Sequence, residues 1–127
     1  MAGCQRISLG VESAAPDILK RLNKNIKPAT VQTATRLARR MGLPVRYYMI
    51  VGSPGETMAT LQQSLDFVRE SEPTEAIFNP FTLLPGTREW DRAAQSGGCN
   101  TDCFFTDTFF ELQPLTSGNG METEKLR

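Results

Sequence analysis

Three segments of strand character alternate with helical segments along the chain, and this alternation constrains the fold more than any other feature. The first, Arg6 to Val11, alternates apolar with small or polar residues. The second, Val45 to Val51, is a nearly unbroken apolar and aromatic run, which is typical of a strand covered on both faces. The third, Glu75 to Leu84, has an irregularity at Pro80. Helices between such strands predict right-handed crossovers, a parallel sheet and an α/β fold of three βα units.

Proline and glycine mark where the intervening helices begin and end. Pro16 opens a short helix and Pro28 a longer one, since the fixed φ of proline suits a first helical turn. Gly42 is expected to end the longer helix by adopting a left-handed backbone conformation. Helical spacing predicts a buried stripe on this longer helix and another on the helix that follows the second strand. The stripe residues are Val31, Ala34, Leu37, Ala38 and Met41 on the first, and Met58, Leu61, Leu65 and Val68 on the second. A short last helix is expected over 88–94. We expect residues 1–96 to form the α/β unit and residues 97–127 a partly mobile C-terminal extension.

Charge and cysteine content exclude several classes of protein. The 14 basic and 14 acidic side chains balance, which gives no electrostatic reason to expect a nucleic acid or an anionic membrane as partner. No apolar run approaches the ~20 residues of a membrane span. The chain has no histidine, which excludes a Ser-His-Asp or Cys-His nucleophile system. Three cysteines make an odd number, so we expect a reducing cytoplasm rather than a disulfide framework.

A carboxylate, Glu12, stands where the first strand hands over to a helix. Ligands of parallel sheets bind at the carboxyl ends of strands, and Ser8 and Gly10 on the same face leave room for one. Glu12 there is suited to hydrogen bonds from ribose hydroxyls or an amine. The alternative is that Glu12 or Ser13 only caps the following helix.

The segment GSPGET, residues 52–57, joins the second strand to its helix. It lacks the Gly-Lys-Ser/Thr ending of a phosphate loop. Pro54 and Gly55 favour a type II turn, and the glycines allow main-chain groups to approach a flat ring such as adenine. The alternative is a plain turn in which Glu56 or Thr57 opens the helix.

Two of the three cysteines, Cys99 and Cys103, are close in sequence, whereas Cys4 is far away. Metal clusters and zinc sites need about four ligands, so we assign no metal site to this pair. The paired phenylalanines at 104–105 and 109–110 have no basic residues between them, so we expect packing rather than stacking on nucleic acid.

Three segments in order resemble the second half of a radical S-adenosylmethionine domain. They are GCQRISLGVESAAPDILKRLNKNI, ARRMGLPVRYYMIVGSPGET and FNPFTLLPGT. The likeness spans residues 2–94 and is greatest to the cobalamin-associated, coproporphyrinogen dehydrogenase-like and methylthiotransferase-like enzymes. It implies strands four to six of a partial (βα)6 TIM-like barrel.

The resemblance also implies a cofactor site for S-adenosylmethionine. Glu12, with Ser13 beside it, falls where the family contacts the ribose or methionine part. Lys24 falls where related enzymes place a basic residue toward the cofactor's carboxylate.

The second and third strands add the adenosine side of that site. Ile50, Val51 and Gly52 match the segment that packs along the adenine. Tyr48 falls where some relatives carry an acidic ribose contact. Pro85 lies in the strand end that lines the same mouth.

The family's CxxxCxxC loop, which holds a [4Fe–4S] cluster, does not occur in this sequence. In the family that cluster donates the electron that cleaves the sulfonium and releases a 5′-deoxyadenosyl radical. We therefore expect a fragment of an iron–sulfur oxidoreductase that is inactive alone and needs an N-terminal half-barrel or self-association. One alternative is a non-catalytic βα module that associates through its exposed sheet. Another is an unrelated α/β enzyme with Glu12 as acid or base.

Overall fold

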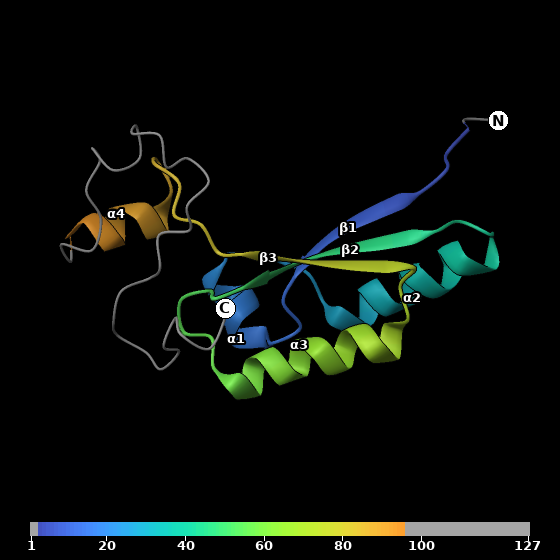
Figure 1. The fold of residues 1–127 in the computed structure, drawn as a ribbon, viewed down its shortest axis with the longest axis horizontal. Coiled ribbons are helices and arrows are strands. Elements are labelled where there is room, and N and C mark those ends of the chain that lie inside the picture. The colour runs from blue at the N-terminus through green and yellow to red at the C-terminus, as the bar shows by residue number, and fades with distance from the viewer. Residues whose placement is uncertain (1–2, 96–127) are drawn as a thin grey trace.

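The computed structural model describes residues 3–95, which form a three-stranded parallel sheet with three helices on one side and a fourth beyond its end (Figure 1). The strands are β1 (Ile7–Glu12), β2 (Val45–Val51) and β3 (Glu75–Pro80), in the order β1-β2-β3. The helices are α1 (Pro16–Arg21), α2 (Pro28–Arg40), α3 (Met58–Ser71) and α4 (Arg88–Gln95). The predicted α/β fold of three parallel βα units is confirmed.

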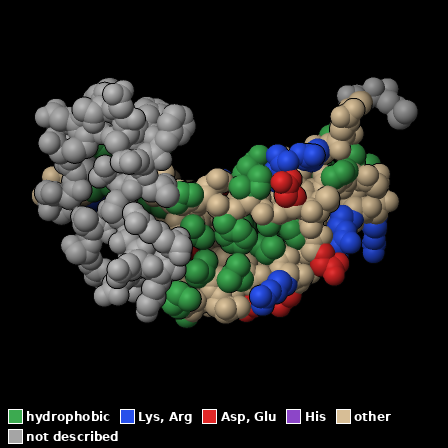
Figure 2. All heavy atoms as spheres, viewed as in Figure 1, with side chains coloured by type: hydrophobic (Ala, Val, Ile, Leu, Met, Phe, Trp, Pro, Cys, Tyr) green, Lys and Arg blue, Asp and Glu red, His purple; other side chains and the backbone are tan. Residues whose placement is uncertain are grey.

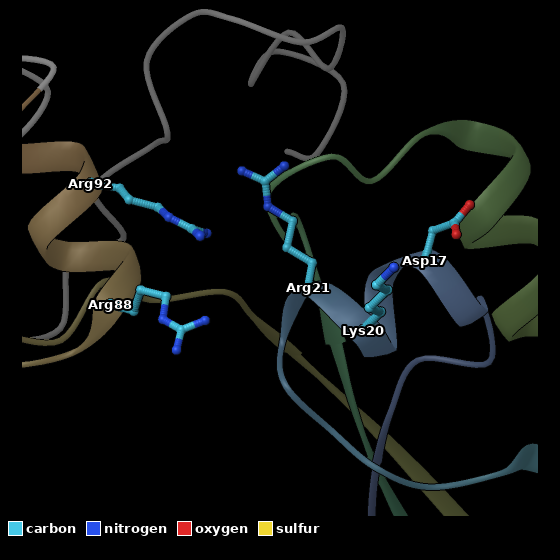
Figure 3. A pocket seen from close by; sticks show the side chains of 5 residues that line it. All are labelled: Asp17, Lys20, Arg21, Arg88 and Arg92. Atoms are coloured by element: carbon cyan, nitrogen blue, oxygen red, sulfur yellow. The ribbon is translucent and has the colours of Figure 1, made fainter.

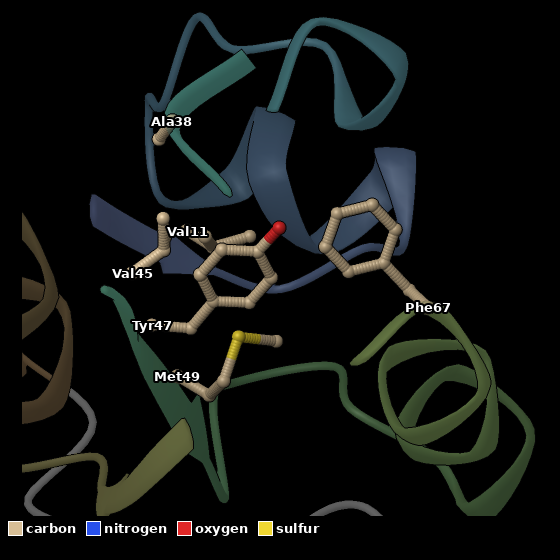
Figure 4. Packing of buried hydrophobic residues seen from close by; sticks show 6 residues of the cluster. All are labelled: Val11, Ala38, Val45, Tyr47, Met49 and Phe67. Atoms are coloured by element: carbon tan, nitrogen blue, oxygen red, sulfur yellow. The ribbon is translucent and has the colours of Figure 1, made fainter. Parts of the chain in front are cut away.

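The core lies between the sheet and the helices below it in Figure 1 (Figure 4). It comprises Val11, Ala38, Val45, Tyr47, Met49 and Phe67. Tyr47 is fully buried, and its ring stacks on Phe67 with centroids 5.9 Å apart. Its hydroxyl lies 2.5 Å from Thr35 Oγ1, which itself donates to the Val31 carbonyl, so Tyr47 is the donor in this pair. A hydroxyl can be buried at this depth because it has such a partner.

The opposite face of the sheet carries no helix within residues 3–95 (Figure 1). We call it the open face; it bears Ser8, Gly10 and Glu12 of β1, Arg46, Tyr48 and Ile50 of β2, and Glu75, Ile77 and Asn79 of β3. In Figure 2 hydrophobic side chains are visible across the middle of the described surface, with charged ones between and around them. By its residues the open face is part apolar, with Ile50 and Ile77, and part charged, with Glu12, Arg46 and Glu75.

Two helix boundaries have defined capping motifs, and the one at Gly42 was predicted from the sequence. At the end of α2, Gly42 has φ +74°, and the Leu43 N–H bonds to the Ala38 carbonyl at 3.0 Å, which closes the helix as a Schellman motif. At the start of α3, Thr57 and Thr60 form a capping box.

Three predictions of detail are wrong. The stripe on α2 is rotated, because Thr35 and Ala38 are buried whereas Leu37 and Met41 are 54% and 76% exposed. On α3, Met58 is exposed and the buried positions include two serines. The third strand ends at Pro80 rather than Leu84, since its partner β2 ends at Val51.

Candidate functional site

The backbone at Glu12 is strained. Its φ is +67°, and the Ser13 N–H bonds back to the Val11 carbonyl at 2.8 Å. A hydrogen bond from residue i+2 to i around a positive φ is the uncommon, strained form of γ-turn. The pairing of β1 with β2 is also irregular between Gly10 and Glu12. Such strain persists where the surrounding structure enforces it, and it is concentrated at functional sites.

The side chain of Glu12 meets Lys24. Glu12 Oε1 lies 2.9 Å from Lys24 Nζ, with the two side chains 19% and 36% exposed. Lys24 is brought there by the end of α1, where Asn23 has φ +54° and the Lys24 N–H bonds to the Leu19 carbonyl. This is a second Schellman motif, with asparagine in the place usually taken by glycine. Two predicted site residues are thus in direct contact.

Gly10 makes space for this pair. A Cβ at Gly10 would lie 2.9 Å from Glu12 Oε1 and 3.3 Å from Lys24 Nζ. Gly10 is not among the residues with positive φ, so its backbone would accept any side chain. The glycine before the carboxylate is therefore required for space and not for conformation.

Glu12 does not cap α1. The N-cap residue is Ala15, with no capping side chain, and the Glu12 carboxylate bonds to Lys24 instead. Ser13 does not cap it either: its Oγ accepts the N–H of Ala15, which is the N-cap itself. The capping alternative fails for both residues.

Ser13 also lies apart from the pair. It is fully buried on the helix side, and its Oγ is 3.1 Å from Ser64 Oγ of α3. Ser64 Oγ also accepts from the Ala14 N–H at 3.0 Å. Ser13 thus ties the β1–α1 loop to α3.

The turn after β2 is a type II turn, as the sequence predicts. The Glu56 N–H bonds to the Ser53 carbonyl at 2.9 Å, and Gly55 at the third position has φ +82°. Thr57 opens α3, so this part of the plain-turn alternative is correct. Glu56 instead folds back, and its Oε2 accepts the Gly52 N–H at 2.5 Å.

Glu56 is a functional-site candidate that the sequence reasoning missed. The residue is 4% exposed, and neither its Oε1 nor the Oγ of Ser53 has a hydrogen-bond partner within residues 3–95. Burial raises the pKa of Glu56 above its ordinary value, against the opposing effect of the bonds from Gly52 and Ser53. A glutamate directly after Pro-Gly and before a threonine cap was the available signal. A buried carboxylate that has a raised pKa and an unpartnered oxygen, and that follows a strand end, is a candidate for a functional site.

The remaining predicted residues lie along the same edge but do not converge on Glu12. Tyr48 pairs in register with Gly10 on the open face, and its hydroxyl accepts from Arg46 Nη1 at 3.3 Å. Ile50 follows it on that face, half-buried. Val51 points to the opposite side, and its carbonyl accepts the Phe81 N–H at 2.7 Å. Pro85 is exposed in the loop before α4.

The described residues offer no metal-ligand set. No three Cys, Asp or Glu side chains converge between residues 3 and 95, and Cys4 is exposed. Cys99, Cys103 and the paired phenylalanines lie outside the described residues, as does the predicted extension. No helix in the described part of the chain is long and apolar enough to cross a membrane.

Comparison with known proteins places these features in a family context. The family model described as "Radical SAM superfamily" matches residues 1–68. An uncharacterised methyltransferase of Pyrococcus horikoshii is 34% identical over 91 residues, which cover 72% of this chain and 20% of that protein. The protein YhcC of Escherichia coli is 32% identical over 94 residues, covering 72% of this chain and 30% of YhcC. The chain thus spans less than a third of the length of either relative.

A solved structure gives the same picture in three dimensions. Elp3 of Methanocaldococcus infernus, with an N-terminal deletion, superposes with a TM-score of 0.63 at 26% identity. The match covers 76% of this chain and 23% of the Elp3 chain. Sequence similarity to these relatives and backbone similarity to Elp3 thus each extend over about three quarters of this chain.

Proposed function

This chain belongs to the radical SAM superfamily, and we propose that its three βα units supply one side of an S-adenosylmethionine site. The observation that carries the proposal is the Glu12–Lys24 pair at the carboxyl end of β1, with Gly10 leaving space beside it. Membership also excludes an unrelated enzyme that uses Glu12 as acid or base.

The pair matches the methionine end of the cofactor in charge. That end carries an ammonium and a carboxylate, and a lysine and a glutamate 2.9 Å apart present the complementary charges. Without ligand the two side chains neutralise each other, and their partial exposure leaves both accessible. Glu12 accepts hydrogen bonds from the ammonium or a ribose hydroxyl, and Lys24 holds the carboxylate.

The turn after β2 supplies the adenine side. Ile50 and Tyr48 offer an apolar and an aromatic surface on the open face. Glu56 holds the Gly52 N–H, which fixes the turn but occupies that donor. The Val51 carbonyl is already bonded to Phe81, so adenine contacts fall to the neighbouring main-chain groups.

The [4Fe–4S] cluster of the superfamily does not fit residues 3–95, where Cys4 is the one cysteine. The chemistry that S-adenosylmethionine supplies in this superfamily, cleavage of its sulfonium, depends on an electron from that cluster. We propose that the cluster is held by a further polypeptide segment, an N-terminal half-barrel, that covers the open face. A second copy of this chain would cover the same face but has no CxxxCxxC loop to hold the cluster. The thiols of such a site suit a reducing compartment such as the cytoplasm.

Titration calorimetry of the purified chain with S-adenosylmethionine tests the proposal. We expect Glu12→Gln and Lys24→Met each to weaken binding about tenfold or more, the usual scale for a charge-assisted bond. Lys24→Met leaves the affinity for adenosine unchanged, because adenosine has no carboxylate. Ser8→Ala, on the same face of the same strand, is the matched control. No heat at millimolar S-adenosylmethionine, or equal affinity in all variants, refutes the proposal.

The second candidate is a non-catalytic module that associates through its sheet. The half-buried Ile50 and Ile77 on the open face favour association. Both edges of the sheet are also unpaired within residues 3–95, and an unpaired edge can pair with another chain. A concentration-dependent mass in sedimentation, lost in Ile50→Lys and accompanied by no cofactor binding, supports this candidate over the first.

A further inference from the structure

A surface hollow of about 460 Å³ lies between α1 and α4 and is lined mainly by cations (Figure 3). Its lining residues are Asp17, Lys20, Arg21, Arg88 and Arg92. In Figure 3 the arginines of α4 and the basic residues of α1 approach the hollow from opposite sides. Two elements far apart in sequence thus bring four positive charges to one place.

These charges are only partly neutralised. Glu89 pairs with Arg92 at 2.5 Å and more loosely with Arg21 at 3.9 Å. No ion pair joins Lys20 or Arg88 to another side chain within residues 3–95. Four cations therefore face two carboxylates, Asp17 and Glu89, and the excess charge in the hollow is positive.

The hollow adjoins the candidate cofactor site. Arg21 Nη1 lies 3.3 Å from the position of a Cβ on Gly55, so Arg21 packs against the turn that Glu56 stabilises. The helices that line the hollow follow β1 and β3, which places it on the carboxyl side of the sheet. A ligand held there would lie at the same edge as a molecule bound to Glu12 and Lys24.

We propose that this hollow binds a phosphate group of a small molecule. Three guanidinium groups and an ammonium suit a multiply charged oxyanion, because arginine presents parallel N–H donors to phosphate oxygens. The volume is of the order that one or two phosphate groups with an attached small moiety occupy. The balanced charge of the whole chain gives no electrostatic reason to expect a nucleic-acid strand instead. Identifying this small molecule as the substrate of a radical SAM enzyme rests on the proposed function. The binding of a phosphate group in the hollow does not depend on it.

Inorganic pyrophosphate is the probe, titrated into the full chain at constant ionic strength and followed by calorimetry. We expect saturable binding that weakens at least tenfold in the double variant Lys20→Gln with Arg88→Gln. Arg40→Gln, an exposed cation at the end of α2, is the matched control and leaves binding unchanged. Both replaced residues of the double variant are exposed, and thermal unfolding checks that it remains folded.

Three results overturn the inference. The first is no binding at 10 mM pyrophosphate, which is roughly the weakest affinity worth calling a site. The second is equal affinity in the double variant and the wild type. The third is displacement of pyrophosphate by a short single-stranded oligonucleotide at a far lower concentration. The last would show a phosphodiester site instead of a small-molecule site. Titration with S-adenosylmethionine is run separately, so that pyrophosphate binding without cofactor binding refutes the proposed function alone.

Discussion

Replacing Gly10 by alanine tests the geometry of the candidate site most directly. The new Cβ would lie 2.9 Å from Glu12 Oε1, whereas ordinary contacts begin at 3.4 Å, so the carboxylate must move. The γ-turn and the irregular pairing at Glu12 limit movement of the backbone, and Lys24 Nζ at 3.3 Å blocks part of the space. We expect the ion pair to break.

The effect on stability is small because two contributions oppose each other. Alanine in an extended strand position stabilises by about 0.5–1 kcal/mol relative to glycine. Loss of a partly exposed ion pair costs up to about 1 kcal/mol. The free energy of unfolding therefore changes by less than about 1 kcal/mol, whereas affinity for S-adenosylmethionine falls about tenfold, or ~1.4 kcal/mol.

Urea unfolding and titration calorimetry on the same preparation separate the two quantities, with Ser8→Ala as control. Unchanged affinity in Gly10→Ala would refute the argument that Gly10 serves the pair. A loss of more than about 3 kcal/mol in stability would instead assign the glycine to packing, since that is the range of core substitutions.

Three further predictions concern the fold. Burial raises the pKa of Glu56 above 4.5, so the native state holds this proton more tightly than the unfolded chain does. The free energy of unfolding therefore falls as pH rises from about 4.5 through the native pKa, and urea unfolding at a series of pH values should show a flatter dependence for Glu56→Gln. Tyr47→Phe removes the buried bond to Thr35 and should cost about 1 kcal/mol by urea unfolding, whereas no loss would show that the hydroxyl is not needed. Thr57→Ala breaks the capping box with Thr60 and should cost about 1 kcal/mol, with Thr57→Ser largely retaining stability; equal loss in both would contradict a capping role.

The order of strands and helices was predictable because it depends on local patterns. Pro28 and Gly42 bound α2, and Pro54 with Gly55 forms the type II turn, each by its own backbone preference. The burial of Thr35 was not predictable in the same way. Which side of a helix meets the sheet depends on tertiary contacts, here the hydroxyl of Tyr47.

The site was predictable only in part. Family resemblance pointed to Glu12 and Lys24, but their contact depends on a strained turn and on a left-handed Asn23 at the end of α1. Glu56 was missed because its buried position results from the fold of its own turn, which composition does not reveal. The roles of these residues in cofactor binding stay predictions.

The parallel arrangement of the sheet also determines when it can form during synthesis. Ile7 pairs with Val45, and Arg46 pairs with Glu75. In each pair the two strands are separated along the chain by a helical segment. Such non-local pairing slows folding, because loop closure must precede any ladder of hydrogen bonds. As the chain leaves the ribosome, β1 has no partner strand within residues 3–95 until β2 has emerged, so pairing inside this segment does not protect β1 in a nascent chain that pauses before Val45.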